Sequence, residues 1–346
     1  MKPSLLLLSG LLSGLLSGAS ALYPKPMKDR LKAQRLKQQQ GDDVLPAVIA
    51  TEFLDAGDVA GGQDATRVHL DGWGGPDSYS GYFRFDGKFR EGSSPTINSY
   101  FWFLPSLDLN PNAPVVLWLQ GGPGASSLHG MFTEIGPFTI DEDLKVVPRA
   151  DGDYSWNQKY SLLFIDNPVG VGWSWSDDTA AYVTNQTQVG SDMADALGQF
   201  FQLFPTQQPN DFYVTGESYA GKYVPATAYT IMTRNEAAKK AAEEAAAKKQ
   251  QPRGGGLRGH KQQEAEMKSL LAENGYINLK GLSVGDGAMD PPSQFSSGYG
   301  DLLWYLAMVD ETQRASFKAY ESKIRASLAA NDGAAAFEAF DEMLNG

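Results

Sequence analysis

"NDFYVTGESYAGKYVPA", residues 210–226, joins a short apolar run to a helical pattern through the small-residue pentad GESYA at 216–220. A turn between two packed elements ordinarily uses Gly, Asn or Asp, because these residues tolerate unusual backbone angles. Here Ser218 occupies the corner instead, with Glu217 directly before it. The stretch therefore predicts a buried strand, a sharp turn and a helix, and both side chains at the turn require an explanation.

The rest of the chain supplies the elements that such a strand needs as neighbours. Residues 79–85 and 99–105 are aromatic and alternate in polarity, as the strands of an antiparallel hairpin do. Apolar residues between Gln188 and Phe204 recur at helical spacing. Apolar runs without alternation, which are typical of strands buried on both faces of a mostly parallel sheet, occur at 115–120, 161–168, 211–216 and 279–287. Buried strands that alternate with helices indicate an α/β fold, with a mixed, mostly parallel sheet flanked by helices.

The composition narrows the class of protein. The 346 residues are 42% hydrophobic and 20% charged, as in a globular protein with a sizeable core. The net charge of −12 argues against nucleic acid as a partner, because no basic face is available to displace phosphate counterions. The chain has no cysteine, which excludes disulfides, metal thiolate sites and a cysteine nucleophile together. The sequence predicts no metal and no other cofactor.

The N-terminal region is typical of a protein that enters the secretory pathway. Residues 1–21 combine an early lysine, a leucine-rich run and small residues at the end, which predicts a signal peptide and a secreted or lysosomal/vacuolar protein. Residues 22–75 form a polar, leader-like or propeptide-like segment, with ordered structure expected to begin between Phe53 and Ser78. No later apolar run reaches the ~20 residues that span a bilayer, so no stable membrane anchor is expected. Asn185 begins an N-glycosylation sequence that is either used or a chance occurrence.

One internal segment does not belong to the predicted core. Residues 235–270 are rich in Ala, Lys and Glu and then in Gly, with few apolar residues until the end. This composition predicts a low-complexity insertion whose first half is a solvated helix and whose second half is disordered. The core, residues 76–234 and 271–295, tolerates such an insertion because loop-closure entropy grows slowly with length.

The pentad and a glycine-rich stretch together have the chemistry of acyl transfer. A serine on a tight strand-to-helix turn aims its hydroxyl away from the sheet and places the next amide, that of Tyr219, at a helix N-terminus where an oxyanion would develop. Residues 118–127 (WLQGGPGASS) follow the first buried strand, and a loop of this kind supplies the second oxyanion amide. The alternatives are a serine that only caps a helix and a plain glycine-rich turn.

Four motifs then carry a resemblance to a known family. They are WLQGGPGASS, TEIGPF, LLFIDNPVGVGWSWS and DFYVTGESYAGKYVPA. Their order and spacing resemble the serine carboxypeptidases from about Tyr79 to Gly346, and Gln120 and the Gly-Asp-Gly at 285–287 resemble the vitellogenic-like branch. The resemblance implies an α/β-hydrolase fold with a helical cap, of which residues 296–346 would be the start. It also implies that the C-terminal residue of a peptide or protein substrate is removed.

The resemblance implies a role for each matching residue. Ser218 would attack the last peptide carbonyl, and the backbone amides of Gly122 and Tyr219 would hold the oxyanion. The positions that receive the substrate's free α-carboxylate in the family correspond to Trp118, Gln120, Gly121, Glu134 and Glu217. Two glutamates bind an anion only if they lie close together and share a proton that one of them donates, which predicts activity at acid pH.

The histidines depart from the family's pattern. A serine hydrolase of this fold needs a histidine base and an orienting carboxylate that follow the serine in the chain. His69 and His129 precede Ser218, and His260 lies in the insertion. The triad Asp and His are therefore expected to be absent from this chain, and His129 is not expected to replace the base. Ala125 stands where some members of the family have a cysteine.

Three interpretations stay open at this point. The first is a serine carboxypeptidase whose missing triad residues mean either that the sequence is part of a longer protein or that the product is inactive. The second, within the same chemistry, is transfer of the acyl group to an alcohol instead of water. The third is a catalytically inactive peptide-binding or protective protein that keeps the pocket. The sequence predicts no particular oligomeric state.

Overall fold

The computed structural model describes residues 47–70, 73–149, 154–249 and 260–345. The described residues form two compact units, an α/β unit that ends at Asp286 and a helical unit that begins at Gly287. The predicted signal peptide, residues 1–21, lies outside the described residues. Within the ranges given above, no helix combines the length and the apolar character that crossing a membrane requires.

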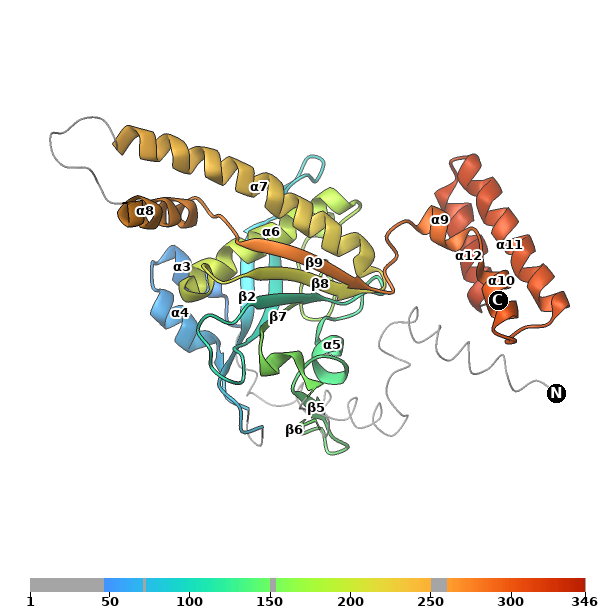
Figure 1. The fold of residues 1–346 in the computed structure, drawn as a ribbon, viewed down its shortest axis with the longest axis horizontal. Helices are drawn as coiled ribbons and strands as arrows, with labels where there is room; N and C mark the ends of the chain where they lie inside the picture. The colour runs from blue at the N-terminus through green and yellow to red at the C-terminus, as the bar shows by residue number, and fades with distance from the viewer. Residues whose placement is uncertain (1–46, 71–72, 150–153, 250–259, 346) are drawn as a thin grey trace. The chain divides into compact units, whose positions relative to one another are not determined.

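The α/β unit is built on a seven-stranded sheet in the order β1-β2-β3-β7-β4-β8-β9 (Figure 1). The strands are β1 (Arg67–Val68), β2 (Ser78–Asp86), β3 (Thr96–Leu104), β4 (Val115–Leu119), β7 (Ser161–Ile165), β8 (Phe212–Glu217) and β9 (Leu279–Gly285). Pairing is antiparallel from β1 to β7 and parallel from β7 through β4 and β8 to β9. The predicted hairpin and the predicted mostly parallel sheet are thus confirmed.

Helices cover both faces of this sheet, with α6 and α7 over one face and α5 near the other (Figure 1). The helices of the unit are α3 (Ala50–Asp55), α4 (Val59–Thr66), α5 (Leu128–Thr133), α6 (Gln186–Leu203), α7 (Ala220–Lys249) and α8 (His260–Glu273). Short 3-10 helices are η2 (Trp156–Gln158), η3 (Thr179–Ala181) and η4 (Pro205–Gln207), and β5 (Phe138–Ile140) pairs with β6 (Val146–Pro148).

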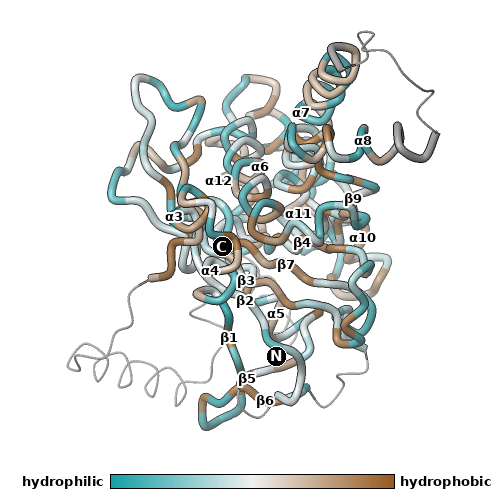
Figure 2. The backbone as a smooth tube through the Cα atoms, turned by 90° about the vertical axis from the view of Figure 1, so that its left-hand side faces the viewer, coloured by the Kyte–Doolittle hydropathy of each residue, from teal (hydrophilic) through white to brown (hydrophobic). Residues whose placement is uncertain are grey.

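The alternation of side chains along each strand divides the core into two layers. In β4, Val115, Leu117 and Leu119 pack into the cluster that contains residues of α6 and α7. Val116 and Trp118 point the other way, into the cluster that contains residues of α5 and β5. The central strands are correspondingly hydrophobic in Figure 2. This arrangement places the end of β4 between two packed layers and fixes the direction in which the glycine-rich loop leaves the strand.

The ordered structure begins earlier than the sequence indicates. Residues 50–68, within the predicted leader segment, form α3, α4 and β1. Ala50 is fully buried in the main core, and a Cβ atom on Gly62 would lie 2.9 Å from the Leu203 side chain. Leu54 packs against the same core, but the other contacts cited here are made by small residues, which leave a weak periodicity in the sequence. The expected start between Phe53 and Ser78 is therefore wrong.

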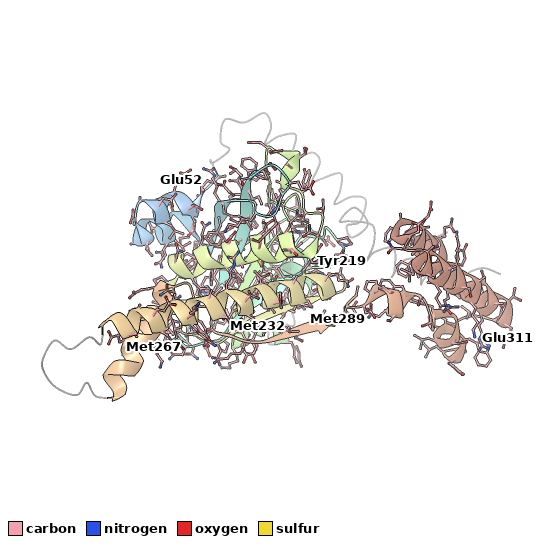
Figure 3. All side chains as sticks on the ribbon, turned by 90° about the horizontal axis from the view of Figure 1, so that it is seen from above. Glu52, Tyr219, Met232, Met267, Met289 and Glu311 are labelled. Carbon is pink, nitrogen blue, oxygen red and sulfur yellow. The ribbon has the colours of Figure 1, made fainter. Side chains whose placement is uncertain are left out.

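The insertion at 235–270 is more helical than predicted. α7 continues through Lys249, as expected for its first half, and α8 begins at His260. Leu270 is buried, and α8, which carries the labelled Met267 in Figure 3, packs on α7. The prediction of disorder is therefore wrong for 260–270, because the apolar residues at the end of the segment give α8 a face to bury. Residues 250–259 lie outside the described residues.

The helical unit has a small core of its own. Its helices are α9 (Pro291–Phe295), α10 (Tyr299–Tyr305), α11 (Glu311–Ala329) and α12 (Gly333–Asn345). Phe295 stacks on Phe340 at 4.3 Å between ring centroids, and Ile324 lies in the same cluster. A capping box between Asp310 and Gln313 begins α11. Helices α10 to α12 lie in residues 296–346, the segment predicted to be the start of a helical cap, whereas α9 lies in residues 271–295, which were predicted as part of the core.

Candidate active site

Ser218 lies on a sharp turn between β8 and α7, in a backbone conformation that few side-chain-bearing residues adopt. Its φ is +56°, and its amide donates to the Gly285 carbonyl at 2.9 Å. The turn is tight because its neighbours are small: a Cβ atom on Gly216 would lie 2.4 Å from the Leu119 carbonyl oxygen, and Ala220 is fully buried. The next residue, Tyr219, lies at the start of α7 (Figure 3). Packing on all sides thus holds a strained serine in place, as at the nucleophile turn of a hydrolase.

The glycine-rich loop after β4 lies directly against this turn. A Cβ atom on Gly121 would lie 2.7 Å from the Tyr219 amide nitrogen and 2.8 Å from the Ser218 Cβ. Gly122 and Gly124 have φ of +113° and +98°, which favour glycine. The structure therefore brings the loop that carries Gly122 to the backbone of Ser218 and Tyr219, where the sequence predicts the two oxyanion amides.

A buried carboxylate that was not predicted from the sequence holds this loop. Asp166 is 2% exposed and accepts hydrogen bonds from the Ser126 hydroxyl at 2.6 Å and the Ser127 amide at 2.9 Å. Its other oxygen accepts from the Trp173 amide at 2.8 Å. Burial raises the pKa of Asp166, and the hydrogen bonds act against that rise. One side chain thereby ties the loop after β4 to the loop after β7.

The predicted carboxylate-binding side chains form one hydrogen-bonded network. Gln120 is 4% exposed, and its Oε1 accepts from Trp118 Nε1 at 2.9 Å. Its Nε2 donates to Glu217 Oε1 at 2.5 Å and to Glu134 Oε1 at 3.3 Å. Because the indole can only donate, it fixes the orientation of the Gln120 amide and turns the nitrogen toward the two carboxyl groups. The structure thus brings Glu134 and Glu217 together, from α5 and β8.

The pKa of Glu217 is raised because its carboxyl group is half-buried and lies beside a second one. Burial first, and then the charge of Glu134, raise the pKa of Glu217 to about 7. Asp286, which follows β9 and accepts from the Ser218 amide at 3.2 Å, adds to this rise. A hydrogen bond between the two carboxyl groups contributes to the raised pKa of Glu217, and no described hydrogen bond reaches the buried Oε2 of Glu134. At acid pH the site therefore offers a carboxylic acid that can donate to an anion.

His129 is a further member of this network that sequence reasoning considered only as a base. Its Nε2 lies 3.2 Å from Glu134 Oε1, and the hydrogen bond with Glu134 raises the pKa of His129. Residues five apart do not meet on a regular helix. They meet here because α5 ends at Thr133 and Glu134 leaves the helix with φ −120° and ψ −74°. The helix end is the feature that sequence spacing alone did not reveal.

The other two histidines lie elsewhere. His69 Nδ1 lies 3.0 Å from Asp77 Oδ1 at the β1–β2 edge of the sheet, and its side chain is 71% exposed. His260 is the first residue of α8. The two histidine side chains with described ion pairs, those of His69 and His129, are both engaged by carboxyl groups.

Asn185 has a structural contact whether or not it carries a glycan. The residue is exposed and caps α6, with its Oδ1 accepting from the Gln188 amide at 3.1 Å. The amide nitrogen to which a glycan is attached is not used in that hydrogen bond. Glycosylation at Asn185 stays a prediction.

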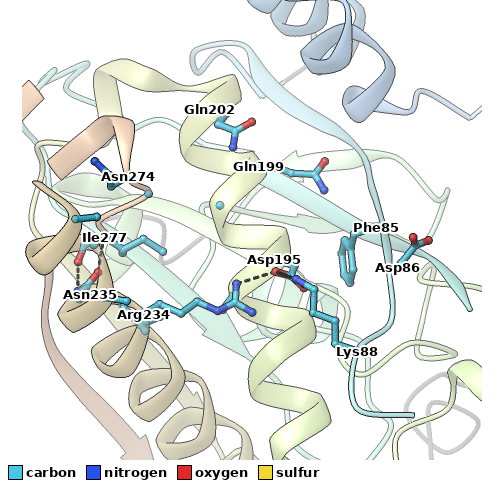
Figure 4. A pocket seen from close by; sticks show the side chains of 17 residues that line it. Phe85, Asp86, Lys88, Asp195, Gln199, Gln202, Arg234, Asn235, Asn274 and Ile277 are labelled. Atoms are coloured by element: carbon cyan, nitrogen blue, oxygen red, sulfur yellow. Dashed lines mark hydrogen bonds and ion pairs between the residues drawn. The ribbon is translucent and has the colours of Figure 1, made fainter. Parts of the chain in front are cut away.

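A separate cavity of about 770 Å³ lies between α6, α7 and the end of β2 (Figure 4). Three of its charged groups pair with one another: Asp195 contacts Arg234 Nη1 at 2.7 Å and Lys88 Nζ at 3.0 Å. Asn235 is hydrogen-bonded to the backbone of Ile277. The cavity shares no lining residue with the network around Ser218, so the candidate chemistry does not involve it.

Comparison with known proteins agrees with the geometry. A model of the family described as serine carboxypeptidase matches residues 74–246, half of the chain. The chain is similar to the venom serine carboxypeptidase of Apis mellifera, 36% identical over 329 residues that cover 95% of this chain and 59% of that protein. It is also similar to the vitellogenic carboxypeptidase of Aedes aegypti, 34% identical over 292 residues that cover 84% of this chain and 52% of that one. The chain thus spans little more than half the length of these curated relatives.

The fold has a counterpart among solved structures. It is similar to that of Kex1, a prohormone-processing carboxypeptidase from Saccharomyces cerevisiae, with a TM-score of 0.60 and 24% identity over 82% of this chain and 56% of that one. This likeness confirms the predicted α/β-hydrolase fold with its mixed, mostly parallel sheet. By the family match, and by the motifs that surround Ser218, the chain belongs to the serine carboxypeptidase family.

Proposed function

We propose that the protein acts as a serine-type carboxypeptidase that removes C-terminal residues from peptides and proteins at acid pH. The observation that carries the proposal is the hydrogen-bonded cluster of Gln120, Glu134 and Glu217 directly before Ser218, in which the pKa of Glu217 is raised. A receptor for a free α-carboxylate next to a nucleophile selects the last peptide bond of a chain. Loss of the Glu217 proton above about pH 7 would remove the hydrogen-bond donor for the substrate's α-carboxylate, so activity is expected to be higher at acid pH.

In this proposal the two halves of the site act on adjacent groups of the substrate. The Ser218 hydroxyl attacks the last peptide carbonyl, and the amides of Gly122 and Tyr219 donate to the oxyanion that forms. The substrate's α-carboxylate accepts from Glu217 and from Gln120 Nε2, where it replaces one of the two carboxyl groups as acceptor, and Trp118 and Gly121 complete the receptor. The acyl group is then transferred from Ser218 to water.

The serine also requires a base, since an unassisted alcohol is a poor nucleophile. His129 is engaged by Glu134, and His69 by Asp77. We therefore propose that neither His129 nor His69 acts as the base, and we expect the 346-residue chain alone to hydrolyse peptides negligibly.

Labelling with a fluorophosphonate probe and release of amino acids from a peptide at about pH 5 test this assignment. Two preparations are compared: the 346-residue chain and a product extended along its reading frame to include an Asp and a His. We expect labelling and release only from the extended product, and loss of both in its Ser218→Ala variant. Robust release by the 346-residue chain would show that the base has been misjudged.

A second candidate is a peptide-binding protein without hydrolysis. The network around Glu217 supports peptide binding without hydrolysis, because the hydrogen bonds of this network involve neither a catalytic His nor a catalytic Asp. This candidate predicts that an extended product still binds peptides through the α-carboxylate but does not label, whereas the enzyme labels.

The predicted signal peptide at 1–21 would direct the protein into the secretory pathway, which leads to acidic compartments such as the lysosome and the vacuole. We propose that the protein enters the secretory pathway and acts outside the cell or in a lysosome or vacuole, with Asn185 as a glycosylation site. N-terminal sequencing of the mature protein, together with its mobility before and after deglycosylation, tests both points.

A further inference from the structure

His129 is a titratable side chain in the candidate site that the proposed chemistry does not use. It projects from α5 toward Glu134, with its Nε2 3.2 Å from Glu134 Oε1. The two side chains are 28% and 25% exposed, so water screens this pair less than it screens a surface pair. The Thr133 hydroxyl lies 3.3 Å from the same ring nitrogen.

The carboxyl groups of Glu134 and Glu217 act on His129, and two further charged groups, Asp286 and Arg149, are linked to that pair. Glu134 follows α5, Glu217 ends β8, and Asp286 follows β9. Arg149 Nη1 donates to the Glu134 backbone carbonyl at 2.6 Å. The balance of charge at His129 therefore depends mainly on which of His129, Glu134 and Glu217 hold protons.

We propose that His129 is a positioning residue of the α-carboxylate receptor: as an imidazolium it pairs with the Glu134 carboxylate and leaves the shared proton of the carboxyl pair on Glu217. The inference rests on the proposed function, because it names the group that keeps the receptor attractive to an anion. The role proposed for His129 is not a catalytic one, since His129 would contact neither Ser218 nor the substrate carbonyl.

Charge counting shows what the imidazolium changes. With His129 protonated, Glu134 ionised and Glu217 protonated, the three groups sum to zero, and a substrate carboxylate meets a donor without a repelling charge. With a neutral residue at 129 and one proton on the carboxyl pair, the sum is −1, and the remaining carboxylate repels the substrate. The pKa of His129 is raised by Glu134 first and also by Glu217, in the direction that keeps the imidazolium at mildly acid pH.

Binding measurements on the 346-residue chain test this without requiring turnover. The probe is a fluorescent pentapeptide with a free C-terminal carboxylate, and the reference is the same peptide as its C-terminal amide, both titrated between pH 4.5 and 8. We expect His129→Gln to bind the free acid about tenfold more weakly than wild type near pH 6.5, as expected for loss of one adjacent opposite charge. The two proteins should converge toward pH 8, as His129 loses its proton and the site then carries the same charge in both.

Two further variants separate charge from fold. His129→Arg keeps a positive charge at every pH tested and should restore binding near pH 6.5. His69→Gln makes the same replacement in the exposed pair with Asp77 and should leave the pH profile unchanged. Affinity for the amide should not differ among the variants, because it carries no charge at its C-terminus.

The outcomes distinguish this inference from the proposed function. Equal affinity of the wild-type chain for the acid and the amide at pH 5 would overturn the α-carboxylate receptor itself. A clear preference for the acid, combined with an unchanged pH profile in His129→Gln, would overturn only the role of His129. Failure of His129→Arg to restore binding would likewise contradict a role through charge.

Discussion

The two halves of the candidate site are held in place by different forces. The serine half is fixed by backbone packing: Ser218 has a φ of +56°, and Gly121 lies against it with no room for a Cβ atom. The carboxylate half is fixed by side chains whose hydrogen bonds depend on protons, above all the one on Glu217. Changes in pH should therefore act on substrate binding, while the geometry of the nucleophile stays constant.

The largest change in stability is expected from a substitution in the serine half. Gly121→Ala would place a methyl group 2.7 Å from the Tyr219 amide nitrogen and 2.8 Å from Ser218 Cβ. Because the contacts are with backbone and a packed turn, the free energy of unfolding should fall by about 3 kcal/mol, as for overpacked cores. Chemical denaturation at pH 5 and pH 8 measures it, and the loss should be the same at both.

Gly198→Ala is the matched control. Gly198 lies within α6, and a Cβ atom there meets nothing within 4 Å. The same substitution should therefore stabilise the protein, by about 0.5 to 1 kcal/mol, the ordinary helix preference for Ala over Gly. A Gly121→Ala variant as stable as wild type would show that the loop does not pack as described.

Glu217→Gln tests whether the stability of the carboxylate half depends on the proton of Glu217. The pKa of Glu217 is about 7 in the folded protein, above its ordinary value of 4.5. The stability linked to that proton is present below about pH 4.5 and is lost as the pH rises through about 7. Since the group is half-buried, the loss is about 1.5 kcal/mol after allowance for solvent screening. The glutamine variant, which has no proton to lose, should show a correspondingly smaller decrease between pH 4.5 and 8.

Denaturation midpoints across this range measure the effect. Glu236→Gln, at an exposed position on α7, is the control and should follow the wild-type curve. Parallel curves for wild type and Glu217→Gln would mean that Glu217 titrates as an ordinary surface carboxyl group.

A smaller change, an increase in stability, is expected from a substitution of Ser218 itself. A side chain at φ +56° is strained, and glycine relieves that strain. Ser218→Gly should therefore raise the free energy of unfolding by about 1 kcal/mol, whereas Ser218→Ala should not. Thermal unfolding of the two variants side by side measures the difference, and equal melting temperatures would contradict a strained turn.

The same two halves differ in how far the sequence could predict them. The serine turn was predictable because small residues around Ser218 have few roles other than close packing, and the apolar runs beside it have the length of buried strands. Even there, β8 extends one residue beyond the predicted end, to Glu217.

The carboxylate half was predictable only through the family resemblance, because Gln120, Glu134 and Glu217 come from three segments that sequence spacing does not connect. The parts that were missed share a physical cause, which is that their contacts depend on local geometry that leaves no periodic signal. His129 meets Glu134 only because a helix ends between them, and small side chains make several of the contacts of residues 50–68.

The central claim is that the carboxylate half receives a free α-carboxylate through a protonated Glu217. It is tested most directly by the ratio of affinities of the Ser218→Ala chain for a peptide acid and for its C-terminal amide, measured at pH 5 and at pH 8. We predict a preference for the acid of about tenfold at pH 5 that disappears at pH 8, as the charge on the receptor changes. Equal affinities for acid and amide at pH 5 would contradict it.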